Sequence, residues 1–140
     1  MPYGTANVDV IQSSVANTPV QFNDGNGTQV GTLCRAWVNY KGTATRAINA
    51  SFNVSSVTYN STGDYTVNFT NAMPDANYSP SCMGWRSGAS NNGYLAWPAQ
   101  LASGTPFATS SFRVQSGIPQ STSTNSSLVD ADGVFVSIFR

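Results

Sequence analysis

Apolar and polar residues alternate at every second position over several short runs, and this alternation constrains the fold most strongly. Between residues 47 and 56 the even positions are mostly apolar and the odd positions mostly polar, and residues 64–70 repeat the pattern with apolar odd positions. Side chains on a β-strand point alternately to the two faces of its sheet, so each run predicts a strand with one buried face. No run places apolar residues at helical spacing over three turns, so we expect no substantial helix.

The run from Leu33 to Tyr40 departs from this pattern because both of its faces are apolar. Its residues form two alternating sets, with Cys34, Ala36, Val38 and Tyr40 on one face and Leu33, Arg35, Trp37 and Asn39 on the other. A strand that is apolar on both faces is expected to be buried on both.

Further strands are expected at residues 78–86, 111–115 and 134–139, separated by turns rich in Asn, Asp, Ser and Gly. Many short strands with regular turns are typical of β-sandwiches and barrels. We therefore predict an all-β fold, an antiparallel and jelly-roll-like β-sandwich in residues 31–140, with residues 1–30 as a lead-in segment. The predicted core residues are Cys34, Ala36, Val38, Tyr40, Ile48, Phe52, Val54, Tyr65, Val67, Phe69, Val134, Val136 and Ile138.

Charged residues are scarce, and this scarcity excludes several classes of partner. The 140 residues include six basic and six acidic side chains, 9% of the chain, while 40% are hydrophobic. Binding to nucleic acid or to an anionic membrane needs clustered basic residues, and here Lys41 is the only lysine and the arginines are scattered. No secretory leader opens the chain, and no apolar run is long enough to span a bilayer. We expect neither nucleic-acid binding nor membrane insertion, and synthesis in a cytoplasm.

Histidine is absent, which excludes the commonest catalytic and metal-binding arrangements. Neither a Ser-His nor a Cys-His nucleophile can form. Paired carboxylates could cleave a polysaccharide, but five of the six Asp residues lie in turn contexts that favour local hydrogen bonds. Segments 24–27 and 130–133 resemble calcium loops only faintly, since the chain has no Glu to serve as a bidentate ligand. We expect no enzymatic activity and no metal or other cofactor.

Two cysteines, Cys34 and Cys82, lie in separate strand-like runs. A disulfide and two free thiols are both compatible with this arrangement. Because reducing compartments disfavour disulfides, we predict two buried free thiols.

A long irregular stretch between residues 84 and 107 contains the candidate binding residues. Long loops in compact domains are commonly functional. Aromatic rings stack on sugar rings, and amide and guanidinium groups donate to sugar hydroxyls, so this composition is typical of a glycan-binding surface. The alternative is that the aromatic residues anchor the loop to the sheet or to a neighbouring chain. The candidates for receptor contact are Trp85, Arg86, Asn91, Asn92, Tyr94, Trp97 and Gln100.

Three segments are similar to a known module. They are Gly31-Thr-Leu-Cys-Arg-Ala-Trp-Val-Asn-Tyr-Lys-Gly-Thr, Ala50-Ser-Phe-Asn-Val-Ser-Ser-Val-Thr and Gly63-Asp-Tyr-Thr-Val-Asn-Phe-Thr. Together with Gln12-Ser-Ser and Gly27-Thr-Gln-Val-Gly-Thr they cover about half of the chain. They resemble the C-terminal, distal module of bacteriophage and prophage tail fibre proteins.

The resemblance implies a homotrimeric, non-enzymatic virion protein at the tip of a tail fibre or another appendage. Threefold assembly would bury the second face of the 33–40 strand, so Leu33, Arg35 and Trp37 are candidate subunit-interface residues. Residues 1–30 would attach the chain to other virion proteins. Bacterial surface polysaccharide is the candidate receptor.

Three other functions stay open. A capsid-decoration or tail adaptor protein would bury the loop aromatics against another subunit, so the exposure of Trp85 and Trp97 distinguishes it from a receptor-binding module. A polysaccharide-degrading tailspike enzyme would need two Asp carboxyl groups about 5 to 10 Å apart in a groove. A carbohydrate-binding protein outside any phage would carry a secretory signal on its natural gene.

Overall fold

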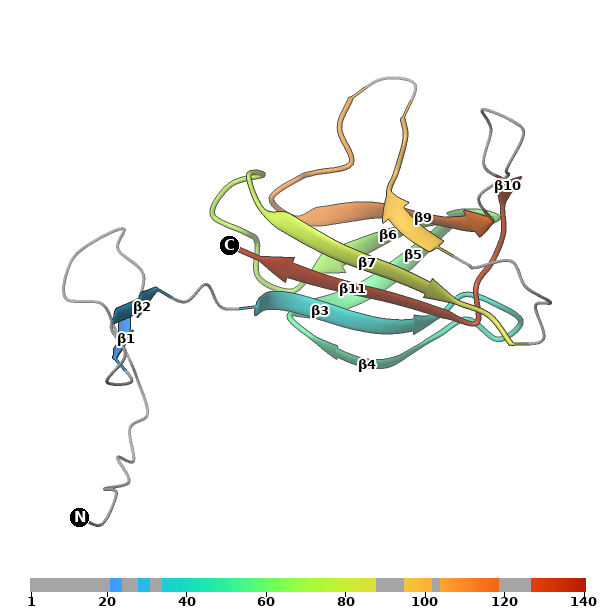
Figure 1. Ribbon diagram of the computed structural model, residues 1–140. Coiled ribbons are helices and arrows are strands. Elements are labelled where there is room, and N and C mark those ends of the chain that lie inside the picture. Colours follow the sequence, from blue (N-terminus) through green and yellow to red (C-terminus); the bar gives the residue numbers. More distant parts are fainter. Residues whose placement is uncertain (1–20, 24–27, 31–33, 88–94, 102–103, 119–126) are drawn as a thin grey trace, which may run out of the picture. The chain divides into compact units, whose positions relative to one another are not determined.

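The computed structural model describes residues 21–23, 28–30, 34–87, 95–101, 104–118 and 127–140, and these residues form strands, turns and loops (Figure 1). The described part of the chain contains no helix, so the predicted all-β class is confirmed. The strands are β1 (Gln21–Asn23), β2 (Thr28–Val30), β3 (Cys34–Lys41), β4 (Ala47–Phe52), β5 (Val54–Ser61), β6 (Asp64–Phe69), β7 (Ser79–Trp85), β8 (Leu95–Pro98), β9 (Ser111–Ile118), β10 (Ser127–Leu128) and β11 (Gly133–Phe139).

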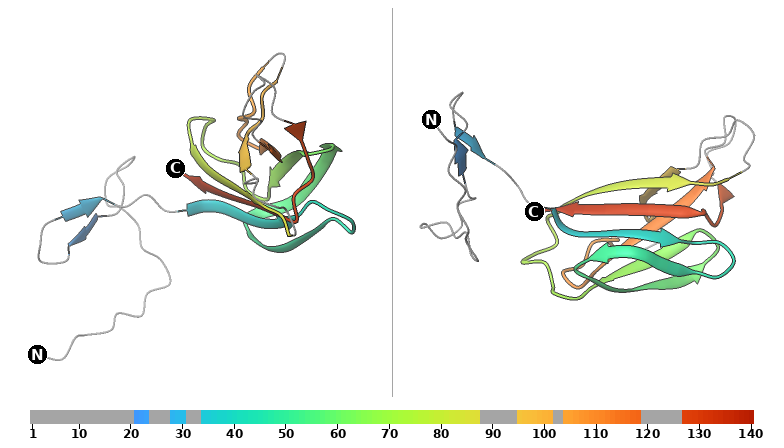
Figure 2. Two further views of the ribbon diagram at one scale, coloured as in Figure 1. Left: turned by 45° about the vertical axis from the view of Figure 1, so that its right-hand side comes forward. Right: turned by 90° about the horizontal axis from the view of Figure 1, so that it is seen from below.

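The chain divides into two compact units, residues 1–33 and residues 34–140. In the first unit β1 and β2 pair as a short antiparallel hairpin. The second unit consists of two antiparallel sheets that lie as two layers (Figure 2). One sheet has the order β4-β3-β11-β7, and the other has the order β10-β9-β6-β5 with β8 also paired to β9.

One hydrophobic core lies between these two sheets, built from the inward side chains of alternate residues. The strands β3 and β11 supply it from one sheet, and β6 and β9 supply it from the other. Burial of these side chains is the main force that holds the layers together. The buried core residues are Ala36, Val38, Tyr40, Tyr65, Val67, Phe69, Met73, Tyr78, Phe112, Val114, Ala131, Val134, Val136 and Ile138.

Most of the predicted core residues lie in this core, and Phe52 does not. Ile48 and Val54 are partly buried against it, and Cys34 is half-buried. Phe52 is 54% exposed because a bulge in β4 shifts the register. Tyr40 pairs with Ile48, whereas the residue before it in β3, Asn39, pairs with Ala50, so one residue of β4 has no partner between them. The extra residue turns the end of β4 over, so the prediction of Phe52 as a core residue is wrong for the single chain.

A single residue, Asn53, separates β4 in one sheet from β5 in the other. Its φ of 54° is in the left-handed region, which Asn tolerates better than most residues. Its side-chain Nδ2 donates to the backbone carbonyl oxygens of Arg35 (3.0 Å) and Asn71 (3.1 Å), and its side-chain Oδ1 accepts from the Asn71 backbone N–H (2.8 Å). This corner therefore takes the chain from one layer to the other with no loop between the two strands.

Candidate functional site

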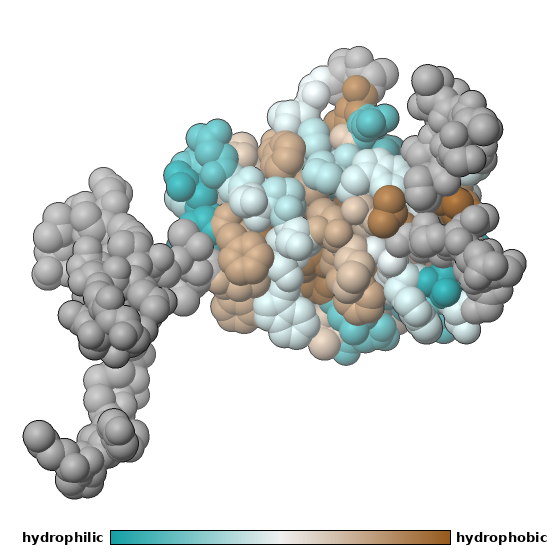
Figure 3. Space-filling model, in the orientation of Figure 1, coloured by the Kyte–Doolittle hydropathy of each residue, from teal (hydrophilic) through white to brown (hydrophobic). Residues whose placement is uncertain are grey.

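The outer face of the β4-β3-β11-β7 sheet exposes large hydrophobic side chains. Six large hydrophobic residues are exposed in the described part of the chain, and five of them lie on this face, the sixth being Leu95 on β8. Figure 3, in the orientation of Figure 1, shows hydrophobic residues gathered over these strands. We call this surface the apolar outer face; it consists of Trp37, Phe52, Met83, Trp85, Phe135 and Phe139.

Strand register brings these side chains together. Trp37 on β3 pairs with Phe52 on β4, and Phe135 on β11 pairs with Met83 on β7. Gly133 makes room for two rings, since a Cβ there would lie 3.0 Å from the Phe135 ring and 3.6 Å from Trp85 Cε3. Hydrophobic side chains are therefore exposed on the outer side of all four strands, with Ser137 of β11 paired opposite Trp37 and Asn39 of β3 paired opposite Phe135.

The size of this face can be compared with that of a protein interface. The exposed fractions of its side chains are 38% for Trp37, 54% for Phe52, 60% for Met83, 56% for Trp85 and 39% for Phe139. They leave roughly 500 Å² in contact with water, taking about 200 Å² for each large side chain. A standard interface buries about 800 Å² on each partner, somewhat more than half of it apolar. The apolar outer face is thus large enough to form the centre of one such interface.

The outer face of the other sheet is polar. Outward residues of β5, β6 and β9 meet in register, as in the rows Ser56–Asn68 and Thr58–Thr66–Arg113. Side-chain hydrogen bonds join the strands, with 3.0 Å from Asn68 Nδ2 to Thr58 Oγ1. We call this surface the polar outer face; it consists of Ser56, Thr58, Asn60, Asp64, Thr66, Asn68, Arg113 and Gln115.

A buried carboxylate, Asp64, organises one end of the polar outer face. Arg113 binds both of its oxygens, at 2.8 and 2.9 Å, and the amides of Gln115 (3.1 Å) and Asn60 (2.9 Å) also donate to it. Burial by itself raises the pKa of Asp64, but these hydrogen bonds outweigh it and hold the pKa below its ordinary value. Asp64 is therefore a structural ion-pair partner that stays charged near neutral pH.

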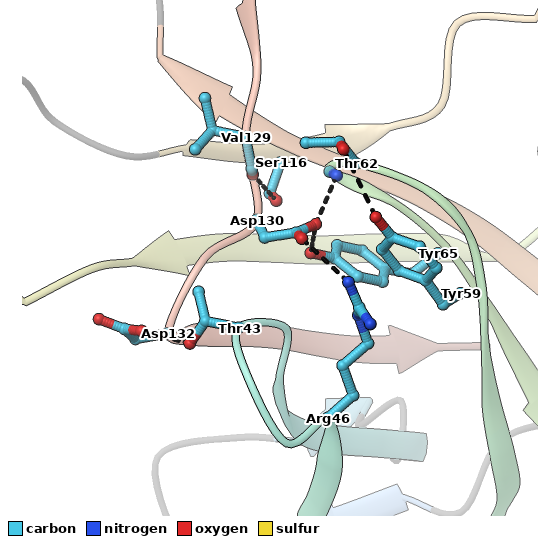
Figure 4. A network of polar contacts seen from close by, with 10 residues as sticks. Thr43, Arg46, Tyr59, Thr62, Tyr65, Ser116, Val129, Asp130 and Asp132 are labelled. Carbon is cyan, nitrogen blue, oxygen red and sulfur yellow. Dashed lines mark hydrogen bonds and ion pairs between the residues drawn. The ribbon is translucent and has the colours of Figure 1, made fainter.

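A second carboxylate, Asp130, connects the two sheets just before β11 (Figure 4). Its Oδ1 accepts from the Tyr65 hydroxyl (2.8 Å) and from the Gly63 N–H (2.7 Å), and its Oδ2 pairs with Arg46 (3.2 Å). The Arg46 guanidinium lies 3.5 Å from the centre of the Tyr59 ring. Burial and the Asp130 carboxylate raise the pKa of Tyr65, so this hydroxyl stays a hydrogen-bond donor.

The remaining described carboxylates also make long-range contacts. Asp132 accepts from the Thr43 hydroxyl and from the Ser87 N–H (2.8 Å), and Asp75 binds Arg140 through both oxygens. The sequence prediction that most Asp residues make purely local hydrogen bonds is therefore wrong for the described ones. Sequence spacing gave no signal for it, because the partners lie 45 to 89 positions away.

The predicted receptor-contact residues do not form one described surface. Trp85 lies on the apolar outer face, whereas Trp97 is half-buried on β8, in register with Gln115 beside the polar outer face. Arg86 and Gln100 are exposed, and the Gln100 backbone N–H donates to Gln115 Oε1 (3.1 Å). The residues that lie outside the described part of the chain are Asn91, Asn92, Tyr94 and the interface candidate Leu33.

The separation of Trp85 from Trp97 follows from a strand that the sequence did not predict. β8 forms inside the predicted loop and pairs with β9, so the chain passes from β7 in one sheet to β8 in the other. Gly84 on β7 allows the backbone of β8 to approach closely, since a Cβ at this position would lie 2.8 Å from the Leu95 carbonyl oxygen. Phe107, at the far end of the same stretch, packs on Tyr78 and Phe112 at 5.5 Å between ring centres.

The two interface candidates in the described residues also differ in environment. Trp37 is 38% exposed on the apolar outer face, and Arg35 is exposed beside a bulge where β3 pairs with β11.

Cys34 and Cys82 are both free thiols and both half-buried, and burial raises the pKa of Cys82 to about 12. Cys82 therefore has little thiolate character at neutral pH.

Within the described ranges, no group of three or more Cys or Asp side chains could hold a metal ion. Within the same ranges, none of the elements is a helix long and apolar enough to cross a membrane. No known family matches the chain, and comparisons with curated proteins and with solved structures found no similar protein. The geometry of the two outer faces is therefore what a functional hypothesis must use.

Proposed function

We propose that the chain is a non-enzymatic virion structural protein, the tip module of a phage tail fibre or appendage, which contributes to recognition of the host-cell surface. In this proposal it is a jelly-roll-like β-sandwich that assembles as a homotrimer, and residues 1–30 attach it to other virion proteins. The sequence resemblance to distal tail fibre modules supports the proposal.

The apolar outer face is the observation that carries it. Its exposed hydrophobic side chains leave roughly 500 Å² in contact with water, which is near the upper end for the largest such patch on a monomer and is compatible with an interaction site. A polar rim would complete the area of an interface. Trp37, one of the residues expected at a subunit contact, lies in its middle strands. In a trimer, burial of this face would contribute stability that a single chain lacks.

The placement of Trp85 supports an alternative role for part of the predicted receptor site. Trp85 is continuous with Phe135 and Met83, so the contact that suits it best is with another subunit. A capsid-decoration or tail adaptor protein with no receptor role would use the same face. The two roles differ in whether the assembled protein binds a glycan.

A polysaccharide-degrading role has less support. A glycosidase needs a carboxylic acid with a raised pKa to protonate the leaving group. In Asp64, Asp75 and Asp132 the hydrogen bonds and ion pairs lower the pKa instead. These carboxyl groups are suited to holding elements together.

The native mass in solution tests the proposal, measured by light scattering after size exclusion at about micromolar concentration, where obligate oligomers of standard interface size stay assembled. A mass near three chains is expected. A monomer would contradict assembly through the apolar outer face, and a stable dimer would contradict the trimeric tip while keeping the face as an interface.

A further inference from the structure

The polar outer face contains a hydrogen-bonding unit in which two neighbouring hydroxyl groups orient the Asn68 amide. Asn68 on β6 donates one amide hydrogen to Ser56 Oγ and the other to Thr58 Oγ1, both at 3.0 Å. The amide carbonyl oxygen of Asn68 then remains as an acceptor. Each hydroxyl oxygen accepts a hydrogen and keeps its own proton as a donor. The unit therefore presents two donors around one acceptor on an exposed surface.

A second unit of the same kind lies beside it, with the strands exchanged. Asn60 on β5 donates its two amide hydrogens to Asp64 Oδ1 and to Thr66 Oγ1, both at 2.9 Å. The Thr66 hydroxyl again keeps its proton as a donor, and the Asn60 carbonyl oxygen remains an acceptor. The two units together form an array of alternating donors and acceptors across β5 and β6.

The array suits a ligand that carries many hydroxyl groups. Neighbouring strands lie about 4.8 Å apart, and alternate residues along a strand lie about 7 Å apart, which is the scale of one sugar ring and its neighbour. Because internal hydrogen bonds already hold these side chains, a ligand would cost little side-chain entropy on binding. A sugar hydroxyl both donates and accepts, so it can satisfy either kind of group.

The charge of the face selects among such ligands. Arg113 and Asp64 are its two charged groups, and they bind each other through two hydrogen bonds. An anionic polymer would need cations that are free of internal partners, and Arg113 is already neutralised. The face therefore complements a polymer with no charge.

An aromatic ring lies at the β8 end of the same row of residues. Trp97 is in register with Gln115, which is in register with Asp64. The tip of the indole lies close to the backbone of Gly117, where a Cβ would lie 3.0 Å from Trp97 Cη2. This half-buried indole offers a surface on which a sugar ring can stack.

We propose that the polar outer face binds a neutral polysaccharide, with hydroxyl groups on the Asn60 and Asn68 units and one ring on Trp97. The inference rests on the proposed role at a bacterial surface. It assigns glycan contact to the β5-β6-β9 face and β8, and it removes Trp85 from the glycan site.

An array of bacterial surface polysaccharides, divided into neutral and anionic members, tests the inference with the full-length chain. Binding is expected on neutral members only. Thr58→Val should weaken it about threefold to tenfold, as the loss of one hydrogen bond does, and Trp97→Ala about thirtyfold. The matched controls are Thr45→Val, in the exposed turn before β4, and Trp85→Ala on the apolar outer face; both should bind as the unmodified chain does.

Binding to anionic members alone, or to no member, would overturn the inference, as would an equal loss of binding in Trp85→Ala and Trp97→Ala. Thermal unfolding and native mass of each variant show whether a loss of binding reflects a loss of fold. A trimer that binds no neutral polysaccharide rejects this inference alone. A monomer that binds one through Thr58 and Trp97 rejects the trimeric tip and leaves the inference standing.

Discussion

The two outer faces of the molecule are built from the same kind of strand, yet they present opposite chemistry. On the β4-β3-β11-β7 sheet the outward residues include Trp, Phe and Met beside Asn39, Ser81 and Ser137, and on the β5-β6-β9 sheet they are Ser, Thr, Asn and an ion pair. Both sheets send apolar residues inward to one core. Core packing thus constrains the inner positions, and the exposed outer positions can carry contacts with partners.

The largest effect is expected when charged residues are placed on the apolar outer face. A Phe52→Lys, Met83→Lys variant is expected to weaken self-association about a thousandfold, because two large apolar contacts are lost and two charges take their place. The two side chains are 54% and 60% exposed, so the fold should remain. Sedimentation velocity over a dilution series measures the effect.

The matched control for that experiment is Thr58→Lys on the polar outer face. It adds a charge at an exposed strand position of the other sheet and should leave self-association unchanged. Equal dissociation by both variants would show that the two faces do not differ in the way proposed.

The next largest effect is expected from the ion pair of the polar outer face. Asp64→Asn removes a buried carboxylate that Arg113, Gln115 and Asn60 all bind, and it should cost about 3 kcal/mol of unfolding free energy. Denaturant unfolding at pH 7 measures this cost. The isosteric variant Thr66→Val, also on β6, is the control and should cost less than 1 kcal/mol, roughly one hydrogen bond.

The Asp64→Asn variant should also change how the stability of the fold depends on pH. The folded protein holds the pKa of Asp64 below its ordinary value of 3.8. The stabilisation is therefore fully present above that value, and it is lost as the pH falls through 3.8 to the lower folded pKa. Asp64→Asn should flatten the loss of stability in this acid range, and an unchanged slope would contradict the role given to Asp64.

The corner at Asn53 is expected to show a smaller effect. Asn53→Ala removes its side-chain hydrogen bonds and places at a φ of 54° a residue that tolerates the left-handed region less well than Asn, which should cost about 2 kcal/mol. Asn53→Gly loses the same hydrogen bonds, but Gly adopts a positive φ without strain, so this variant should cost only about 1 kcal/mol. Thermal unfolding of the two variants compares them, and an Ala variant as stable as the Gly variant would argue against backbone strain.

The smallest effect is expected where the two layers are joined by Tyr65. Tyr65→Phe removes one hydrogen bond to Asp130, which keeps the Gly63 N–H and Arg46 as partners. A loss of about 1 kcal/mol is expected from chemical denaturation. Association and glycan binding should both be unchanged, because Tyr65 is completely buried and lies on neither outer face.

Much of the layered fold follows from the alternation in the sequence, and the exceptions have physical causes. The strands at 34–41, 64–69, 79–85 and 133–139 lie where alternation predicts them. The run 47–56 was predicted as one strand, but Asn53 divides it between two sheets, and a positive φ leaves no mark on the alternation. The bulge in β4 likewise depends on pairing with β3, which no local pattern encodes.

The candidate site was predictable only in part. The two apolar faces of residues 33–40 predicted burial on both, but in the single chain only one face is buried, and Trp37 on the other is 38% exposed. Trp85 and Trp97 looked like neighbours because they lie in one irregular stretch. The pairing of β8 with β9 assigns them to different sheets, and such long-range pairing is set by tertiary packing rather than by local composition.

The corner at Asn53 also limits how a protein of this design can change through evolution. Phe52 is registered against Trp37 in one sheet, and Val54, two positions later, is registered against Phe69 in the other. Insertion or deletion of one codon between them would exchange the inward and outward side chains of one of the two strands, since a one-residue slip moves each side chain to the other face. New contacts can therefore arise here by replacing outward residues one at a time, while the length of this segment stays fixed.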